Sequence, residues 1–129
     1  MARPRAWLLN FDAGDELAAP VGYTASPAVL ARFPALTTRV LGLLAPGDVL
    51  VEPGAPPLPP GAFQGRAWCP TPRALEALAS AGAVVPDAPA LAVLQRVNHR
   101  RFSASLTPTL PGARFVASLD DALACIASP

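Results

Sequence analysis

Near its start the chain reads Ala6-Trp7-Leu8-Leu9-Asn10-Phe11, a short apolar run with polar residues directly after it. A run of this length and composition is typical of a buried strand. The acidic stretch 12–16 follows at once, and we expect it to form a turn. We therefore place the first strand of the fold at residues 6–11.

Two helices begin with the same device, a hydroxyl residue followed by proline, at Ser26-Pro27 and Thr71-Pro72. The hydroxyl caps free backbone N–H groups, and proline suits the first helical position. The first helix should kink or split at Pro34, and its apolar face consists of Val29, Phe33, Leu36, Val40 and Leu44. The second helix should end at Gly82 after carrying Leu75, Leu78 and Ala79.

The remaining pattern alternates between strands and helices. Further short strands are expected at 49–51, 65–69, 84–85 and 114–117. A helix starting at Asp87 should turn Ala90, Val93, Leu94 and Val97 inward, with Gln95, Arg96, His99 and Arg100 on its other side. A capping box of Ser118 and Asp121 opens a last helix, whose apolar stripe is Leu119, Leu123 and Ile126. This alternation predicts a three-layer α/β fold with a mainly parallel, short-stranded sheet.

Composition narrows the classes of function. The chain has 129 residues, a length that suits one domain. Its basic residues are all Arg and its net charge is only +1, so we expect no nucleic-acid partner. No apolar run is long enough to cross a bilayer and no signal-peptide pattern is present, so we expect no membrane partner and a cytoplasmic location. Two cysteines do not make a disulfide framework in a reducing compartment.

Polar side chains follow the first strand, where open α/β sheets bind their ligands. Asn10 and Asp12, with Asp15 and Glu16, could line a site for a substrate or metal there. The alternative interpretation is a solvated acidic turn.

Cys69 lies between a predicted strand and the helix that starts after Thr71. A thiol near a helix N-terminus can become reactive, with His99, the only histidine, as a base. The alternative is a buried cysteine that behaves as a small apolar residue. Cys69, Cys125 and His99 do not have the spacing of metal ligands, so we expect no metal site.

A third polar cluster, residues 98–101, includes Asn98 and Arg100. Arg96 and Arg100 share a helix face, where like charges repel unless an anion or acidic partner lies nearby. A solvated helix face, with Arg stems covering apolar surface, is the alternative.

Three stretches together carry a resemblance to a known family: residues 8–13, residues 68–75, and residues 97–102 with 110–113. They resemble the amino-terminal part of an uncharacterised group of bacterial ATP-grasp-like proteins. The resemblance implies a Rossmann-like pre-ATP-grasp domain over residues 1–106 and, over residues 107–129, the start of a following ATP-grasp region. In that family the lysines, the glycine-rich loop and the metal-binding carboxylates belong to the region that follows.

The resemblance implies an accessory, substrate-side domain of a ligase-like protein that joins a carboxylate to an amine or thiol. We expect the chain to be inactive alone and to contain no catalytic residue. ATP and Mg are expected to bind only when the missing ATP-grasp region is present, or when a partner chain supplies that region. Substrate contacts are expected from Asn10, Asp12, Thr71, Asn98 and Arg100. The alternatives are a stand-alone interaction module, with homo-oligomers as one form, and a thiol enzyme that uses Cys69.

Overall fold

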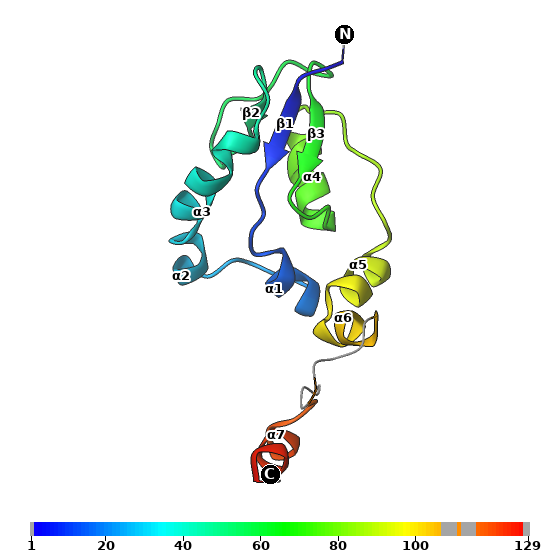
Figure 1. Cartoon of the computed structure of the whole chain (residues 1–129). Coiled ribbons are helices and arrows are strands. Elements are labelled where there is room, and N and C mark those ends of the chain that lie inside the picture. The colour runs from blue at the N-terminus through cyan, green and yellow to red at the C-terminus, as the bar shows by residue number, and fades with distance from the viewer. Residues whose placement is uncertain (1, 107–110, 112–115, 128–129) are drawn as a thin grey trace. The chain divides into compact units, whose positions relative to one another are not determined.

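The fold is known from a computed structural model, which describes residues 2–106, 111 and 116–127 (Figure 1). The side chains of Arg100 and Ser103 lie outside the described part. The elements run in the order β1 (Arg5–Leu8), α1 (Ala13–Ala18), α2 (Pro27–Leu30), α3 (Phe33–Val40), the 3-10 turn η1 (Leu41–Leu43), β2 (Val49–Leu50), β3 (Gln64–Ala67), α4 (Pro72–Ser80), α5 (Leu91–Asn98), α6 (Arg100–Leu106) and α7 (Leu119–Ala127). The chain divides into two compact units, residues 1–95 and residues 96–129. The boundary expected between residues 106 and 107 stays a prediction.

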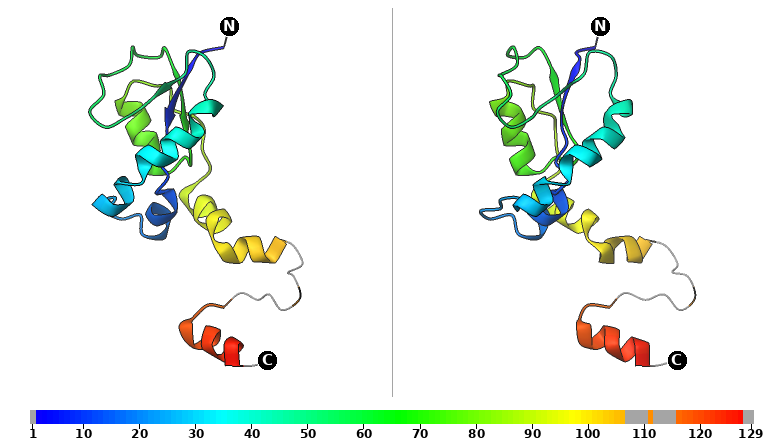
Figure 2. Two further views of the ribbon diagram at one scale, coloured as in Figure 1. Left: turned by 60° about the vertical axis from the view of Figure 1, so that its left-hand side comes forward. Right: turned by 90° about the vertical axis from the view of Figure 1, so that its left-hand side faces the viewer.

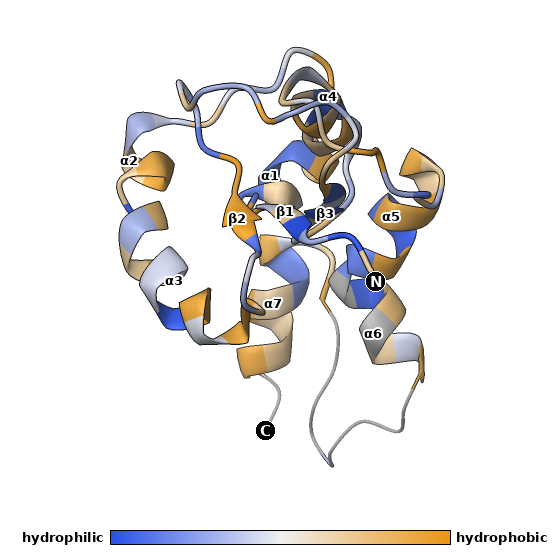
Figure 3. Ribbon diagram, turned by 90° about the horizontal axis from the view of Figure 1, so that it is seen from above, coloured by the Kyte–Doolittle hydropathy of each residue, from blue (hydrophilic) through white to orange (hydrophobic). Residues whose placement is uncertain are grey.

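The protein has an α/β fold with a small parallel sheet in the order β2-β1-β3. Ala6 is paired with Val49 on one side and with Gly65 on the other, which makes β1 the central strand. The predicted parallel arrangement is therefore confirmed. The strand predicted at 84–85 is reduced to one parallel bridge between Gln64 and Val84. β2 is hydrophobic along its whole length (Figure 3).

The core of the first unit is formed by the sheet and α4. Ala6, Leu78 and Ala83 are buried, and partly buried side chains surround them, namely Leu8, Val49, Val51, Leu58, Phe63 and Ala67. Gly65 has no room for a side chain, because a Cβ there would lie 2.8 Å from the Val84 carbonyl oxygen. α4 packs against β1 and β3 on one side of the sheet, and α3 lies on the other side (Figure 2).

Asp48, which precedes β2, connects the amino ends of β1 and β2 through hydrogen bonds and an ion pair. Its carboxylate accepts hydrogen bonds from the backbone N–H of Arg5 (3.0 Å) and of Ala45 (3.0 Å), and from the indole of Trp7 (3.2 Å). The Arg5 guanidinium adds an ion pair at 3.0 Å. Burial alone would raise the pKa of Asp48, but these hydrogen bonds outweigh it and lower the pKa to about 2.

The helix predicted from residue 27 to residue 44 is split, as expected, and Pro34 lies in the first turn of the second piece, α3. Ser26 caps α2 by accepting a hydrogen bond from the Val29 N–H at 3.2 Å. The face predicted to be apolar is the less exposed one, but none of its five residues is fully buried. Phe33 of this face lines an open cleft rather than a filled core.

Residues 12–16 are not a turn, because α1 begins at Ala13. Ala13 and Leu17 are buried and hold the helix against the fold. Asp15 and Glu16 lie in its first turn, where the helix dipole favours negative charge. The acidic stretch that suggested a solvated turn is therefore the start of a short helix.

α4 begins and ends where the sequence predicts. The Thr71 hydroxyl caps it by accepting from the Ala74 N–H at 3.3 Å. Gly82 follows with a φ of +92°, the left-handed conformation that glycine adopts at little cost.

α5 begins at Leu91 rather than at Asp87. Of the four residues predicted to face inward, only Leu94 is buried. Gln95, predicted on the outer side, is half-buried and donates a hydrogen bond from its side chain to the Leu17 carbonyl oxygen at 2.9 Å. The face of α5 that packs inward is therefore shifted by about one residue from the predicted face.

In the second unit, Ser118 caps α7 by accepting a hydrogen bond from the Asp121 N–H at 3.1 Å, as predicted. The apolar stripe of α7 is exposed, at 74% for Leu119, 55% for Leu123 and 81% for Ile126. The strand predicted at 114–117 lies largely outside the described residues. Among the described helices, none combines the length and the apolar character needed to cross a membrane.

Candidate functional site

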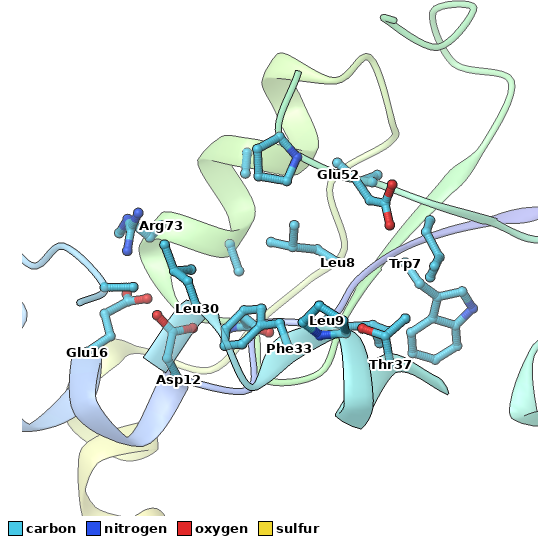
Figure 4. A pocket seen from close by; sticks show the side chains of 18 residues that line it. Trp7, Leu8, Leu9, Asp12, Glu16, Leu30, Phe33, Thr37, Glu52 and Arg73 are labelled. Atoms are coloured by element: carbon cyan, nitrogen blue, oxygen red, sulfur yellow. The ribbon is translucent and has the colours of Figure 1, made fainter. Parts of the chain in front are cut away.

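A cleft of about 740 Å³ opens in the first unit at the carboxyl ends of β1 and β2 (Figure 4). Ligands of open α/β sheets bind at this edge, and a volume of several hundred Å³ is typical of a small-molecule site. The cleft is lined by Trp7, Leu8, Leu9, Asn10, Asp12, Glu16, Ala25, Leu30, Phe33, Pro34, Thr37, Leu50, Val51, Glu52, Pro53, Arg73, Ala74 and Ala77.

Asn10 joins the carboxyl ends of β1 and β3. Its side-chain amide donates to the Cys69 carbonyl oxygen at 2.6 Å, and its amide oxygen accepts from the Cys69 N–H at 3.0 Å. This pair of bonds continues the β1–β3 ladder with a side chain in place of a strand. Asn10 lines the cleft as predicted, but its amide is already satisfied within the protein.

Thr71 and Glu16 form a buried hydrogen-bonded pair between α4 and α1. The Thr71 hydroxyl is fully buried and donates to Glu16 Oε1 at 2.8 Å. Glu16 is only 5% exposed, yet it lines the cleft. Thr71 itself does not line the cleft, so we expect its role to be the placement of Glu16 rather than contact with a ligand.

Asp12 also lies at this end of the cleft, together with Arg73. The Tyr23 hydroxyl donates to Asp12 Oδ2 at 2.8 Å, and the Arg73 guanidinium lies over the Tyr23 ring, 5.3 Å from its centre. Burial and the hydrogen bond to the Asp12 carboxylate raise the pKa of Tyr23 to about 12. The phenol therefore stays a neutral donor that orients Asp12 at physiological pH.

The middle of the cleft is apolar. Figure 4 shows Leu8, Leu9, Leu30 and Phe33 between the Asp12–Glu16–Arg73 end and the end at Trp7 and Thr37. Phe33 meets Phe11 edge to face, with ring centres 5.6 Å apart. This packing fixes one side of the Phe33 ring and leaves the other for the cleft.

Cys69 lies next to this edge, but its environment does not activate a thiol. Desolvation and the nearby charge of Glu16 raise the pKa of Cys69. A reactive thiol needs the opposite shift, because the thiolate is the nucleophile. The structure therefore favours the interpretation of Cys69 as a small, partly buried residue whose backbone receives Asn10.

The residues predicted near the domain junction belong to the second unit. Asn98 is the last residue of α5, and Arg100 is the first of α6, with a side chain outside the described part. His99 Nδ1 accepts a hydrogen bond from the Arg101 N–H at 3.1 Å. The cleft is defined by residues of the first unit alone, so a ligand role for Asn98 and Arg100 stays a prediction.

Sequence patterns found part of this site and missed the rest. Asn10, Asp12 and Glu16 were placed correctly at the carboxyl edge because they directly follow a strand. Arg73 and Tyr23 were missed: Arg73 lies in the stretch 68–75 that carries the family resemblance but was given no role, and Tyr23 belongs to no motif. The only advance signal for Arg73 was its position just after the cap of α4.

No protein-family model, curated protein or solved structure matches this chain. Over the residues that the structure describes, no group of three or more His, Cys, Asp or Glu side chains is arranged to hold a metal ion.

Proposed function

We propose that the chain is the substrate-side accessory domain of an ATP-grasp-type, ligase-like protein of the cytoplasm, and that it binds a small organic molecule in the cleft. The observation that carries the proposal is the cleft itself, which opens at the carboxyl ends of parallel strands and brings charged groups from separate elements to one end. Chemistry would be supplied by an ATP-grasp region, in the same protein or in a partner chain.

A Rossmann-like, three-layer arrangement belongs to the same proposal. It is supported by the parallel order β2-β1-β3 and by helices on both sides of the sheet, α4 on one and α3 on the other. The apolar face of α2 and α3 supports it further, because Leu30 and Phe33 face the cleft rather than a filled core.

The cleft does not suit a nucleoside triphosphate. Three carboxylates, Asp12, Glu16 and Glu52, line it against one guanidinium, Arg73. The chain contains no lysine, the residue that usually grips transferred phosphates. ATP would therefore be held by the ATP-grasp region and not by these side chains.

Two tryptophan variants test the proposal. Ala25→Trp fills the cleft from a loop, and Ala55→Trp places the same bulk at an exposed loop position that does not line it. We expect fragment-sized metabolites, screened by saturation-transfer NMR, to bind the natural chain and Ala55→Trp but not Ala25→Trp. Equal binding to both variants, or micromolar binding of ATP with Mg by calorimetry, would contradict the proposal.

A second candidate function, a self-associating interaction module, is favoured by the exposed stripe of α7. Leu119, Leu123 and Ile126 offer a continuous apolar surface. If this function holds, sedimentation equilibrium gives a dimer that Leu123→Asp converts to a monomer. A monomer at all concentrations would exclude it.

A further inference from the structure

Glu16 is a buried carboxylate with only one of its two oxygens hydrogen-bonded. Oε1 accepts the Thr71 hydroxyl at 2.8 Å, whereas Oε2 has no partner among the described residues. The residue is only 5% exposed, and it lines the cleft. Among the described residues no fully buried side-chain oxygen lacks a partner, so Oε2 keeps some exposed surface. Oε2 is thus an open acceptor at the end of an otherwise enclosed side chain.

A buried charge is normally paired, because desolvation of an isolated carboxylate is strongly unfavourable. No cationic side chain of the described residues forms an ion pair with Glu16. Arg73, on the same end of the cleft, lies over the Tyr23 ring instead. The natural partner of Glu16 is therefore a cation that enters from the cleft.

The surroundings of Glu16 favour a cation over an anion. The start of α4 does not need an anionic ligand, because the Thr71 hydroxyl already accepts a hydrogen bond from the Ala74 N–H and Glu16 already places a negative charge there. Asp12 adds a second carboxylate at the same end, held in place by the Tyr23 hydroxyl. A phosphate or carboxylate ligand would meet both acidic groups and only one guanidinium, that of Arg73, so negative charge predominates at this end.

The rest of the cleft indicates what the cation is attached to. Leu8, Leu9, Leu30 and Phe33 form an apolar middle section directly beside the acidic end (Figure 4). Such a surface gains free energy by covering hydrocarbon or an aromatic ring, whereas a hydrated inorganic cation would gain nothing from it.

We infer that the cleft binds a primary amine with a hydrophobic body, with the ammonium on Glu16 Oε2 and Asp12 and the body against Leu30 and Phe33. The inference rests on the proposed function and names the ligand class of the same cleft. An ammonium has three donors, enough to reach two carboxylates, and hydrogen bonds between charged partners are about twice as strong as neutral ones.

Three probes with one body and different head groups test this: 3-phenylpropylamine, 3-phenylpropanol and 3-phenylpropionate. We expect NMR titration of the full chain to give a dissociation constant for the amine at least tenfold lower than for the alcohol, with the carboxylate weakest. Glu16→Gln keeps an oxygen for the Thr71 hydroxyl but loses the charge, and should reduce amine binding to the level of the alcohol. Glu76→Gln, on α4 but outside the cleft lining, is the matched control and should change nothing.

Asp12→Asn is a second variant, for use if circular dichroism shows that Glu16→Gln does not fold. It should weaken binding of the amine several-fold and leave binding of the alcohol unchanged. Equal binding of amine and alcohol, or strongest binding of the carboxylate, would overturn the inference and leave the cleft as a binding site. Binding of none of the three probes would overturn the inference, and a fragment screen that also finds no cleft ligand would overturn the proposed function with it.

Discussion

The hydroxyl of Thr71 connects two features of the site, the start of α4 and the position of Glu16. Thr71→Val has nearly the same shape but removes three hydrogen bonds: one from the Ala74 N–H at 3.3 Å, one to Glu16 Oε1 at 2.8 Å, and a long one from the Asn10 amide at 3.4 Å. Loss of an N-cap costs about 1 kcal/mol, and loss of a buried hydrogen bond to a charged group costs about 2 kcal/mol. We therefore expect the free energy of unfolding to fall by about 3 kcal/mol.

Urea denaturation followed by circular dichroism measures this change. With a denaturant dependence of about 1.5 kcal/mol per molar urea, the midpoint should fall by about 2 M. Thr71→Ser, which keeps the hydroxyl and loses one methyl group, should cost only about 1 kcal/mol. Equal stability of Thr71→Val and Thr71→Ser would show that the Thr71 hydroxyl does not hold Glu16 in place.

Three further predictions concern the rest of the first unit. The pKa of Asp48 is lowered from 3.8 to about 2, so the stability that its carboxylate contributes is full above the unfolded pKa and is lost as the pH falls from about 4 to about 2. The difference in urea stability between the natural chain and Asp48→Asn should therefore shrink over that pH range, and a constant difference would contradict the lowered pKa. Gly65→Ala should destabilise the fold by about 2 kcal/mol in the same urea assay, because its Cβ would lie 2.8 Å from the Val84 carbonyl oxygen, and a neutral effect would mean that Val84 lies less close to β3. The pKa of Tyr23, the only tyrosine, is raised from 10.0 to about 12, so the stability that Tyr23 contributes is full below its unfolded pKa and is lost between pH values of about 10 and 12. The absorbance of the phenolate should titrate near pH 12, and Asp12→Asn should move this midpoint closer to 10.

The sequence predicted the elements whose signals are local. The hydroxyl–proline starts of α2 and α4, the end of α4 at Gly82 and the capping of α7 all follow from a few neighbouring residues. The parallel sheet followed from alternation of strands and helices. These features depend on backbone geometry that a short stretch of chain already determines.

The features that were missed depend on distant contacts. Gln95 faces inward because its amide meets a carbonyl seventy-eight residues away, at Leu17. The strand expected at 84–85 is one bridge long, because Val84 alone pairs with the β3 segment: its N–H donates to the Phe63 carbonyl oxygen at 2.9 Å and its carbonyl oxygen accepts from the Gly65 N–H at 2.8 Å. Arg73 lines the cleft and Tyr23 contacts Arg73 and Asp12 only through the fold, and the spacing of fifty residues between Tyr23 and Arg73 carries no signal.

At the candidate site, Asn10 and Glu16 show the same contrast between local sequence signals and distant contacts. Their position after a strand was enough to place them at the carboxyl edge. Their roles were not predictable, because the Cys69 backbone satisfies Asn10 while Thr71 satisfies only one oxygen of Glu16. Which group is open to a ligand is decided by partners from another part of the chain.

Chemical-shift mapping on the nitrogen-15-labelled full chain tests most directly whether the cleft binds small molecules. With 3-phenylpropylamine added, we expect amide shifts that saturate and cluster at the cleft-lining residues Leu8, Leu9, Asn10, Asp12, Phe33 and Val51. Shifts that cluster on α7, or no saturable shifts with this probe or with any fragment of a metabolite library, would contradict it.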